Sequence, residues 1–416
     1  MGELIMSRKE RRRLELMSRV KEKLVTQKKA SELLGISYRQ TKRIWRRYCI
    51  FGDVGLVHRL RGRPSARSKG VKFRKAALAR YTQRYKGFGP TLASEQLEKD
   101  GYQVDHETLR RWLMWAGLWE RRRKRGQHRQ WRERKEYKGE LVQMDGSTHD
   151  WFEGRGPKAV LMVMIDDATS RTYARFVEAE TTEGAMECFE GYARLYGLPQ
   201  ALYVDLDSIY RIAKGEPTLE EQLQGRTRPC TQFERAMNSL GVRIIPAYSP
   251  QAKGRVERRN GVFQDRLIKE MRLAGIKTIE EANRFLEEEF LPDLNRRFTV
   301  AAAKSEDLHR PVGKEINLAE ILSIEEVRHV ARDWTITWRK RYFQIKSSQE
   351  PLPLAGQKVT VRLLRSGEEQ ILYKGRKLRW EELPPRLEKV HCPDLRSPPT
   401  SIKAHSREAQ TRAAAV

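Results

Sequence analysis

The chain of 416 residues is 39% hydrophobic, enough to bury a sizeable core, and its length predicts about two to four domains. Its 83 lysines and arginines outnumber 55 aspartates and glutamates, so the formal net charge of +28 favours a polyanionic partner, with nucleic acid the leading candidate. Four scattered cysteines indicate neither a disulfide framework nor a zinc site, and the longest apolar run, Ala159 to Ile165, is far shorter than the ~20 residues of a membrane-spanning helix.

The first predicted unit, residues 1–62, contains a helix, a tight turn and a second helix. Its start, MGELIMSRKERRR, lacks the apolar stretch of a secretory signal, so we expect a cytoplasmic, nucleoid-associated protein. In KKASELLGISYRQTKRIWRRY the apolar stripe stops at Gly35 and resumes at Ile44, and Ser37 begins a capping-box pattern. The second helix exposes long donors that can reach bases and phosphates: Arg39, Gln40, Lys42, Arg43 and Arg46. The alternative is a solvated helix in a small bundle.

A second unit of three helices is predicted at residues 71–119, after the loop RLRGRPSARSKG. Asp105 caps its third helix, in which Leu109 faces inward while Arg110 and Arg111 remain available for DNA. Two tandem units would suit recognition of a defined DNA end. The competing interpretation is a unit that only packs against a neighbour.

Residues 120–138, ERRRKRGQHRQWRERKEYK, form a basic linker with interleaved aromatic residues. Such a run is usually a solvated linker, but between DNA-binding units and a following domain it favours salt-sensitive contacts with the phosphate backbone. The candidate DNA-binding residues here are Arg121, Arg122 and Arg123.

The central domain, residues 139–300, alternates strands and helices. Three strands, a helix, a strand, a helix, a strand and a helix follow one another, the order of a ribonuclease-H-like α/β core in which the first and fourth strands are neighbours. Asp145 would end the first strand and Asp205 the fourth, so both would project at one sheet edge. Glu257, on the last helix, would complete the cluster.

Three carboxylates in this arrangement suit metal-dependent chemistry on a phosphodiester. Two divalent ions about 3.5–4 Å apart can activate the nucleophile and stabilise the leaving oxygen, and Mg²⁺ prefers carboxylate ligands. We therefore predict that Asp145, Asp205 and Glu257 are catalytic residues and ligands of two Mg²⁺ or Mn²⁺ ions, with Asp145 bridging the pair. Water would release a DNA 3′-hydroxyl, which would then attack a target phosphodiester at the same site.

The segments DGSTHDWFEGRGPKAVLMVMIDDATSR, YVDLDSIYR and YSPQAKGRVERRNGVFQDRL resemble the three acidic blocks of bacterial insertion-sequence transposases with an integrase-type catalytic core, most closely the ISNCY type. The resemblance covers nearly the whole chain. It implies a DDE triad at Asp145, Asp205 and Glu257. It also implies double-stranded DNA partners, namely the element's terminal inverted repeats and the target, and a homo-oligomer that holds both ends in a synaptic complex. No membrane partner is expected.

Four other aspartates compete with this choice. Asp150 lies past the predicted strand end, and Asp166 and Asp167 end the second strand, where a polar turn is the ordinary explanation. Asp207 shares a segment with Asp205, but YVDLDS matches the family block at the first of the two.

Two departures from the family pattern concern the region around Glu257. The segment between Asp205 and Glu257 is longer than in many integrase cores, and the additional residues form the charged insertion RIAKGEPTLEEQLQGRTRP. Gln264 stands where many relatives have a basic residue that contacts the DNA end. Other basic residues are candidates for these phosphate contacts, with solvated charge as the alternative for each: Lys253, Arg255, Arg258 and Arg259.

The C-terminal region changes to short strands at residues 326–383, which predicts a small β-barrel that contacts DNA or another subunit. Residues 392–416 are polar with an Ala-rich end, which predicts disorder. The competing hypothesis for the whole chain is a noncatalytic DNA-binding regulator, against which the three intact acids argue. A viral-type integrase would need a His/His/Cys/Cys zinc arrangement, and a plain ribonuclease H would not need two DNA-binding units.

Overall fold

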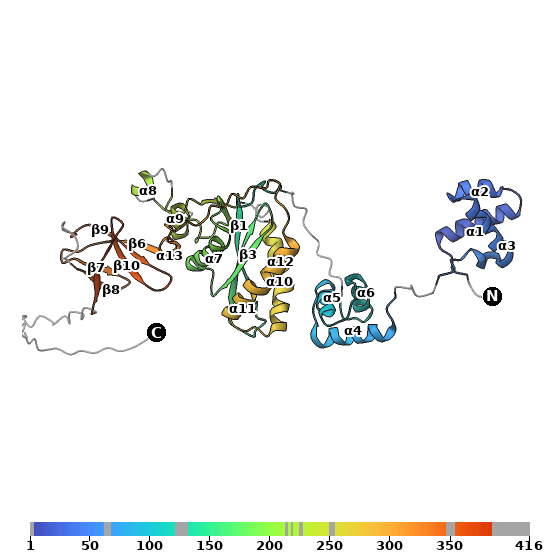
Figure 1. Ribbon diagram of the computed structural model, residues 1–416, viewed down its shortest axis with the longest axis horizontal. Helices are drawn as coiled ribbons and strands as arrows, with labels where there is room; N and C mark the ends of the chain where they lie inside the picture. Colours follow the sequence, from blue (N-terminus) through green and yellow to red (C-terminus); the bar gives the residue numbers. More distant parts are fainter. Residues whose placement is uncertain are drawn as a thin grey trace, which may run out of the picture. The chain divides into compact units, whose positions relative to one another are not determined.

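A computed structural model describes residues 4–61, 68–120, 132–212, 215–217, 219–223, 228–248, 254–346 and 354–384. The chain divides into two compact units, Met1–Arg121 and Arg122–Val416 (Figure 1). No helix in the described ranges is long and apolar enough to cross a membrane. The predicted disordered tail, 392–416, lies outside these ranges.

The first helical bundle consists of three helices and a short 3₁₀ turn: α1 (Arg8–Lys21), α2 (Gln27–Leu34), α3 (Tyr38–Phe51) and η1 (Gly52–Leu56). Gly35 turns the chain between α2 and α3 with a φ of +64°, a left-handed conformation that glycine adopts without strain. The Ser37 side chain then accepts a hydrogen bond of 3.3 Å from the backbone N–H of Gln40, so the predicted cap is confirmed. Ala30 and Ile44 pack in the small core that results.

The second bundle has three helices: α4 (Val71–Arg84), α5 (Pro90–Lys99) and α6 (His106–Trp115). Asp105 caps α6 as predicted, because its carboxylate accepts hydrogen bonds from the backbone N–H groups of Glu107 and Thr108. Leu109 and Leu113 are fully buried, which fixes α6 against its neighbours.

The central sheet has five strands: β1 (Val142–His149), β2 (Ala159–Asp166), β3 (Thr172–Val177), β4 (Ala201–Val204) and β5 (Arg243–Pro246). Their order is β3-β2-β1-β4-β5, so the first and fourth strands are neighbours, as predicted. The predicted strand end at Asp145 is wrong. β1 continues to His149 because the wholly buried β2 pairs with it throughout, for example Gly146 with Met162.

Helices cover both faces of this sheet (Figure 1). On one face lie α7 (Thr182–Tyr196) and α9 (Gln232–Ser239); on the other lie α10 (Gly254–Ala274), α11 (Ile279–Phe285), the π-helical η3 (Leu286–Phe290) and α12 (Leu291–Phe298). Side chains of β1 alternate between the two cores: Met144 packs with Phe189 and Phe233 on the α7 side. Because successive side chains of a strand point to opposite faces, Asp145 points toward the α10 side. The short α8 (Leu219–Leu223) lies in the insertion between β4 and β5.

The C-terminal module begins with α13 (Leu318–Ile321) and continues with β6 (Ile324–His329), β7 (Thr335–Trp338), β8 (Arg341–Ile345), β9 (Lys358–Leu363), β10 (Glu369–Tyr373), β11 (Arg376–Leu378) and β12 (Trp380–Leu383). The predicted small β-barrel is not confirmed. The described strands form two separate sheets, ordered β11-β10-β9-β6 and β12-β8-β7. Trp338 and Phe343 of one sheet share a core with Val361 and Ile371 of the other, so the two sheets bury apolar faces without closing on themselves.

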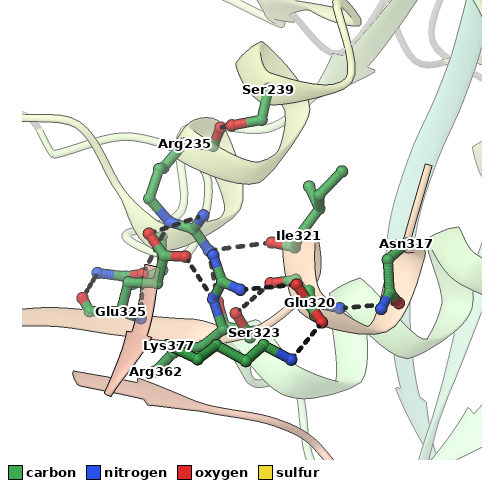
Figure 2. Close-up of polar contacts among 10 residues, drawn as sticks. Arg235, Ser239, Asn317, Glu320, Ile321, Ser323, Glu325, Arg362 and Lys377 are labelled. Atoms are coloured by element: carbon green, nitrogen blue, oxygen red, sulfur yellow. Dashed lines mark hydrogen bonds and ion pairs between the residues drawn. The ribbon is translucent and has the colours of Figure 1, made fainter. Parts of the chain in front are cut away.

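Polar contacts attach this module to α9 (Figure 2). The side-chain amide of Gln232 donates a hydrogen bond of 2.7 Å to the backbone carbonyl oxygen of Glu325 and accepts one of 3.0 Å from its backbone N–H group. Arg235 donates to the carbonyl oxygens of Ile321 and Ser323 and lies 3.3 Å from the Glu325 carboxylate. That carboxylate also pairs with Arg362, which in turn reaches Glu320, as does Lys377. The attachment is thus specified by side chains aimed at particular backbone groups.

We expect Arg235→Ala to lower the free energy of unfolding of the central unit by about 2–3 kcal/mol, because two carbonyl groups and a carboxylate lose their partner together. Urea unfolding followed by tryptophan fluorescence would measure this. Arg328→Ala removes an arginine that pairs with the partly exposed Glu326 and donates to the carbonyl oxygen of its sequence neighbour Val327, so it should change the value by less than about 1 kcal/mol. Equal effects of the two substitutions would contradict the assignment.

Candidate active site

Asp145 lies in the middle of β1, opposite Val163 of β2. One of its carboxylate oxygens, Oδ2, accepts a hydrogen bond of 3.0 Å from the amide of Asn260 on α10. The next residue, Gly146, faces the opposite side of the sheet. A Cβ atom there would lie 2.4 Å from Oε1 of Glu180, so the absence of a side chain makes room for this carboxylate beside the strand.

Asp205 follows directly after β4, the parallel neighbour of β1. Gln143 pairs with Tyr203, so two residues further along each strand Asp145 and Asp205 occupy corresponding positions on the same face. Tyr210 lies close to both: burial raises the pKa of its hydroxyl well above the ordinary value, and the charges of Glu180, Asp205 and Asp145 raise it further. The register therefore places the two aspartates at neighbouring positions on one face of the sheet, Asp145 within β1 and Asp205 just after β4.

Glu257 lies in the first turn of α10, the helix that packs on β1 and β2. Two contacts hold this turn to β1. The Gln143 side chain accepts a hydrogen bond of 3.2 Å from the backbone N–H of Val256, and Asn260 donates to Asp145. Hydrogen bonds from the residues before and after Glu257, Val256 and Asn260, thus connect this turn to the strand that carries Asp145.

The three acids lie on adjoining elements but do not form a closed metal site in this conformation. Within the described residues, no three His, Cys, Asp or Glu side chains form a group positioned to hold a metal ion. Lys253, a predicted DNA contact, lies outside the described part of the chain.

The competing aspartates have structural partners. Asp207 accepts hydrogen bonds from the backbone of Ile209 and the hydroxyl of Ser208, and Asp150 accepts one from the backbone of Gly154, so both stabilise turns. Asp166 accepts three, from the backbone N–H groups of Gly139 and Thr169 and from the Thr169 hydroxyl. These roles agree with the polar-turn explanation.

Asp167 is the centre of a buried polar network. Its side chain is fully buried and accepts hydrogen bonds from Gln143, at 2.6 Å, from the backbone of Lys135, at 2.9 Å, and from Arg132. Arg255 of α10 lies 3.4 Å away. The network therefore connects the end of the basic linker, the turn after β2, the strand of Asp145 and the start of α10.

Two of the basic residues predicted to contact DNA are used inside the core. Arg255 is buried beside Asp167 and donates to the carbonyl oxygen of Arg132, and burial lowers its pKa. Arg259 is also buried, donates to the carbonyl oxygen of Ser170, and has its pKa lowered to about 10 by burial. Arg258 is exposed, and its guanidinium donates to the carbonyl oxygen of Gly254.

The third helix of the first bundle, α3, presents its predicted contact residues to solvent. All five are exposed, while Thr41 and Ile44 face the bundle core. The ammonium group of Lys42 lies 4.6 Å from the centre of the Tyr38 ring. The five residues on this exposed face are Arg39, Gln40, Lys42, Arg43 and Arg46.

The basic residues of α6 differ, because both are paired within their own helix. Arg110 makes two hydrogen bonds to Glu107, of 2.6 and 2.7 Å, and Arg111 makes one of 3.2 Å. Their charge is thus partly compensated locally, which the sequence-based prediction overlooked although Glu107 lies three and four residues away. Arg121, Arg122 and Arg123 lie outside the described residues.

Sequence reasoning also missed Gln143 and Asn260. A signal was present for each: Gln143 lies two residues before Asp145 on the same strand face, and Asn260 lies one helical turn after Glu257. Neither spacing reveals that the amides bond across the strand–helix boundary.

Comparisons with known proteins show which proteins this chain resembles. A helix-turn-helix domain model matches residues 12–65. The chain is 37% identical over 158 residues to the transposase for insertion sequence IS1202 of Streptococcus pneumoniae, covering 37% of this chain and 32% of that protein. Among solved structures, the HTLV-2 integrase catalytic core domain in complex with magnesium is 16% identical, covers 36% of this chain and 82% of that one, and has a TM-score of 0.27, too low to bear on the fold.

A longer match comes from Sinorhizobium fredii. The protein named "Putative transposase y4bF" is 39% identical over 381 residues, which cover 91% of this chain and 82% of that protein. Identity at this level over nearly the full length of both proteins shows common descent, and the chain therefore belongs to the bacterial transposase family that includes y4bF.

Proposed function

We propose that this transposase is of the ISNCY insertion-sequence type and cuts and joins DNA through a DDE triad of Asp145, Asp205 and Glu257. The observation that supports this most is the placement of Asp145 and Asp205 at corresponding positions of two parallel strands, beside the helix of Glu257. Acids on rigid neighbouring elements can keep the spacing that phosphoryl chemistry requires.

The proposed site takes two Mg²⁺ or Mn²⁺ ions. Its donors are oxygen atoms, which these cations prefer, and the buried Oδ1 of Asn260, which accepts no hydrogen bond from any described residue, adds one more oxygen at the same place. When bound, the ions would stabilise charge on the attacking and leaving oxygens of an in-line displacement. Since the three acids do not form a closed group here, the proposal requires the first turn of α10 to bring Glu257 toward the aspartates.

Two displacements at phosphorus follow from this site. In the first, the oxygen of water attacks the phosphodiester at the element end, and the bond to the 3′ oxygen breaks to release a 3′-hydroxyl. In the second, that hydroxyl attacks a target phosphodiester, loses its proton, and displaces the target's own 3′ oxygen. Asp145 and Asp205 would orient the attacking oxygen, and no covalent bond to the protein forms.

The DNA substrate would be held outside the catalytic centre. The exposed donors of α3 suit the major groove of the terminal inverted repeats, and Arg258 suits the phosphates near Glu257. Arg255 and Arg259 would support α10 instead, because they are engaged within the core. Assembly of a homo-oligomer that brings two ends together completes the proposal.

The second candidate, a noncatalytic DNA-binding regulator, is favoured by one observation: the described acids do not form a closed metal group. Purified protein, Mg²⁺ and duplexes that carry the flanking inverted repeats separate the two. A transposase should nick at the repeat boundary and join the released end to a second duplex, whereas a regulator should bind the repeat and leave it intact.

We expect Arg43→Ala to weaken binding to the repeat duplex by about tenfold in the absence of divalent ions, because a contact from the exposed face of α3 is lost. If Arg43 contacts a phosphate, the slope of log affinity against log salt should also fall by about 0.9. Fluorescence anisotropy over a salt series would measure both. Arg19→Ala on α1, which removes an exposed arginine paired with Glu15, serves as the matched control and should leave affinity unchanged. A loss of the same size in both variants would contradict the assignment of α3.

A further inference from the structure

Two cations lie at the tip of the hairpin that joins β7 to β8. Trp338 pairs with Arg341, so the turn between the strands consists of Arg339 and Lys340 alone. Both turn residues have a positive φ, +49° and +64°, as a two-residue hairpin turn requires. Glycine and asparagine adopt this conformation readily, whereas arginine and lysine are strained in it. The chain therefore keeps two charged residues where the backbone geometry favours neither.

A second hairpin in the same module follows the ordinary rule more closely. The turn between β10 and β11 consists of Lys374 and Gly375. Both residues again have a positive φ, +47° and +81°, but glycine fills the second position. The module thus uses glycine in one two-residue turn and not in the other. Because backbone strain persists mainly where it serves a function, the turn of Arg339 and Lys340 is a candidate binding site.

The side chains at this tip are available to a partner. Arg339 and Lys340 are both exposed, and neither has an ion-pair partner in the described part of the chain. The guanidinium carbon of Arg339 lies 4.7 Å from the centre of the ring of Trp338, which is itself fully buried. Stacking on a fixed ring orients the planar guanidinium group and uses none of its N–H donors.

The next cation along the chain, Arg341, has a different role. Its Nε atom donates a hydrogen bond of 2.7 Å to Glu382, and its guanidinium group also pairs with Glu369. These carboxylates raise the pKa of Arg341. Arg341 therefore joins β8 to β12 and β10, and its charge is compensated within the module, while the charge at the tip is not.

We propose that the tip of the β7–β8 hairpin binds the phosphate backbone of duplex DNA without regard to base sequence. The chain carries a formal net charge of +28 and belongs to a transposase family, so DNA is the polyanion that it meets. The guanidinium group of Arg339 matches the geometry of phosphate oxygens, and Lys340 adds a second charge. This site adds to the DNA contacts proposed for α3 and Arg258, and it requires neither the catalytic triad nor a metal ion.

The test measures binding of the full chain to a fluorescein-labelled duplex of unrelated sequence, by fluorescence anisotropy over a salt series in EDTA. Arg339→Asn/Lys340→Gly removes both charges and supplies the residues that the turn prefers. We expect affinity at about 0.1 M salt to fall about tenfold, and the slope of log affinity against log salt to fall by about 1.8, since each lost phosphate contact removes about 0.9. The same variant should unfold at a temperature about 2–4 °C higher, because the strain of the turn is relieved.

Two further variants separate the charge from the geometry of the turn. Arg339→Gln/Lys340→Gln removes the charges and keeps the strained turn, so it should lose the same affinity without a gain in thermal stability. Lys374→Asn makes the corresponding change in the other hairpin. It should also unfold at a higher temperature, but it should bind DNA as the wild type does.

Wild-type affinity and salt slope in both double variants would overturn the proposal, and so would a wild-type chain that does not bind the unrelated duplex. An equal loss for each charge removed in Lys374→Asn would contradict it as well, because binding would then depend on total charge alone. A loss confined to the first double variant would assign the effect to turn geometry. If the hairpin binds a second copy of the chain instead, sedimentation equilibrium would show reduced self-association in both double variants at unchanged DNA affinity, which would also overturn the proposal.

Discussion

Asp145→Asn is expected to reduce both nicking and strand transfer by roughly 10³-fold or more, because about 4 kcal/mol of transition-state stabilisation depends on a charged ligand at this position. The substitution keeps the size and shape of the side chain and retains an oxygen that can accept the hydrogen bond from Asn260. The fold should therefore be unaffected, and binding to the repeat duplex in EDTA should be normal. Gel assays of cleaved and joined products, with a thermal unfolding scan of each variant, would measure these quantities.

The neighbouring aspartates supply matched controls for this prediction. Asp150→Asn and Asp207→Asn keep an acceptor oxygen for the turns that these residues stabilise, so both variants should retain most of their activity. Asp205→Asn and Glu257→Gln should be as inactive as Asp145→Asn. An active Asp205→Asn variant together with an inactive Asp207→Asn variant would show that Asp207 is the second acid. Normal activity in all three triad variants would contradict the proposed catalytic role of the triad.

Asp167→Ala is expected to lower the free energy of unfolding by about 3–5 kcal/mol, the cost of leaving buried charges without their partner. Arg255 would lose its carboxylate, and Arg132, Gln143 and the backbone of Lys135 would each lose an acceptor. Chemical denaturation of the full chain, followed by circular dichroism, would measure the change. The substitution should also impair catalysis, because Gln143 would no longer be held against the start of α10.

A partly exposed aspartate provides the comparison for Asp167. Asp293→Ala removes a carboxylate that pairs with Arg296 and Arg297 at the surface of α12 and should change stability by less than about 1 kcal/mol. A small effect of Asp167→Ala, equal to that of Asp293→Ala, would show that the buried network contributes little to the stability of the core.

The order of elements in the central domain could be predicted because each has a local signal. β2 is an unbroken apolar run, and α7 and α9 are amphipathic, so strand order and the neighbouring position of β1 and β4 followed from the chain. The extent of β1 could not be predicted, because residues 146–149 are polar in sequence and become strand only through pairing with β2. The same limit applies to the C-terminal module, where short strands predicted a barrel and long-range pairing produced two sheets.

The candidate site was predictable to a different degree. The three acids were chosen from predicted positions at two strand ends and in a helix, although Asp145 lies within β1. The internal use of Arg255 and Arg259 could not be predicted, since a run of arginines at the start of a helix is equally typical of a DNA-binding surface. Burial, which distinguishes the two roles, is a property of the folded chain. The contribution of Gln143 was hidden for the same reason, because its partners are Asp167 and Val256, at two distant points of the sequence.

Gly146 has no side chain, and the space beside it is occupied by the carboxylate of Glu180. Even the methyl group of alanine would meet the Glu180 carboxylate, so the two side chains compete for one volume beside β1. Homologues that carry a larger residue at the first position should carry a shorter one at the second. A residue with a side chain at position 146 would therefore require the Glu180 carboxylate to move away from the strand or to be replaced by a shorter side chain.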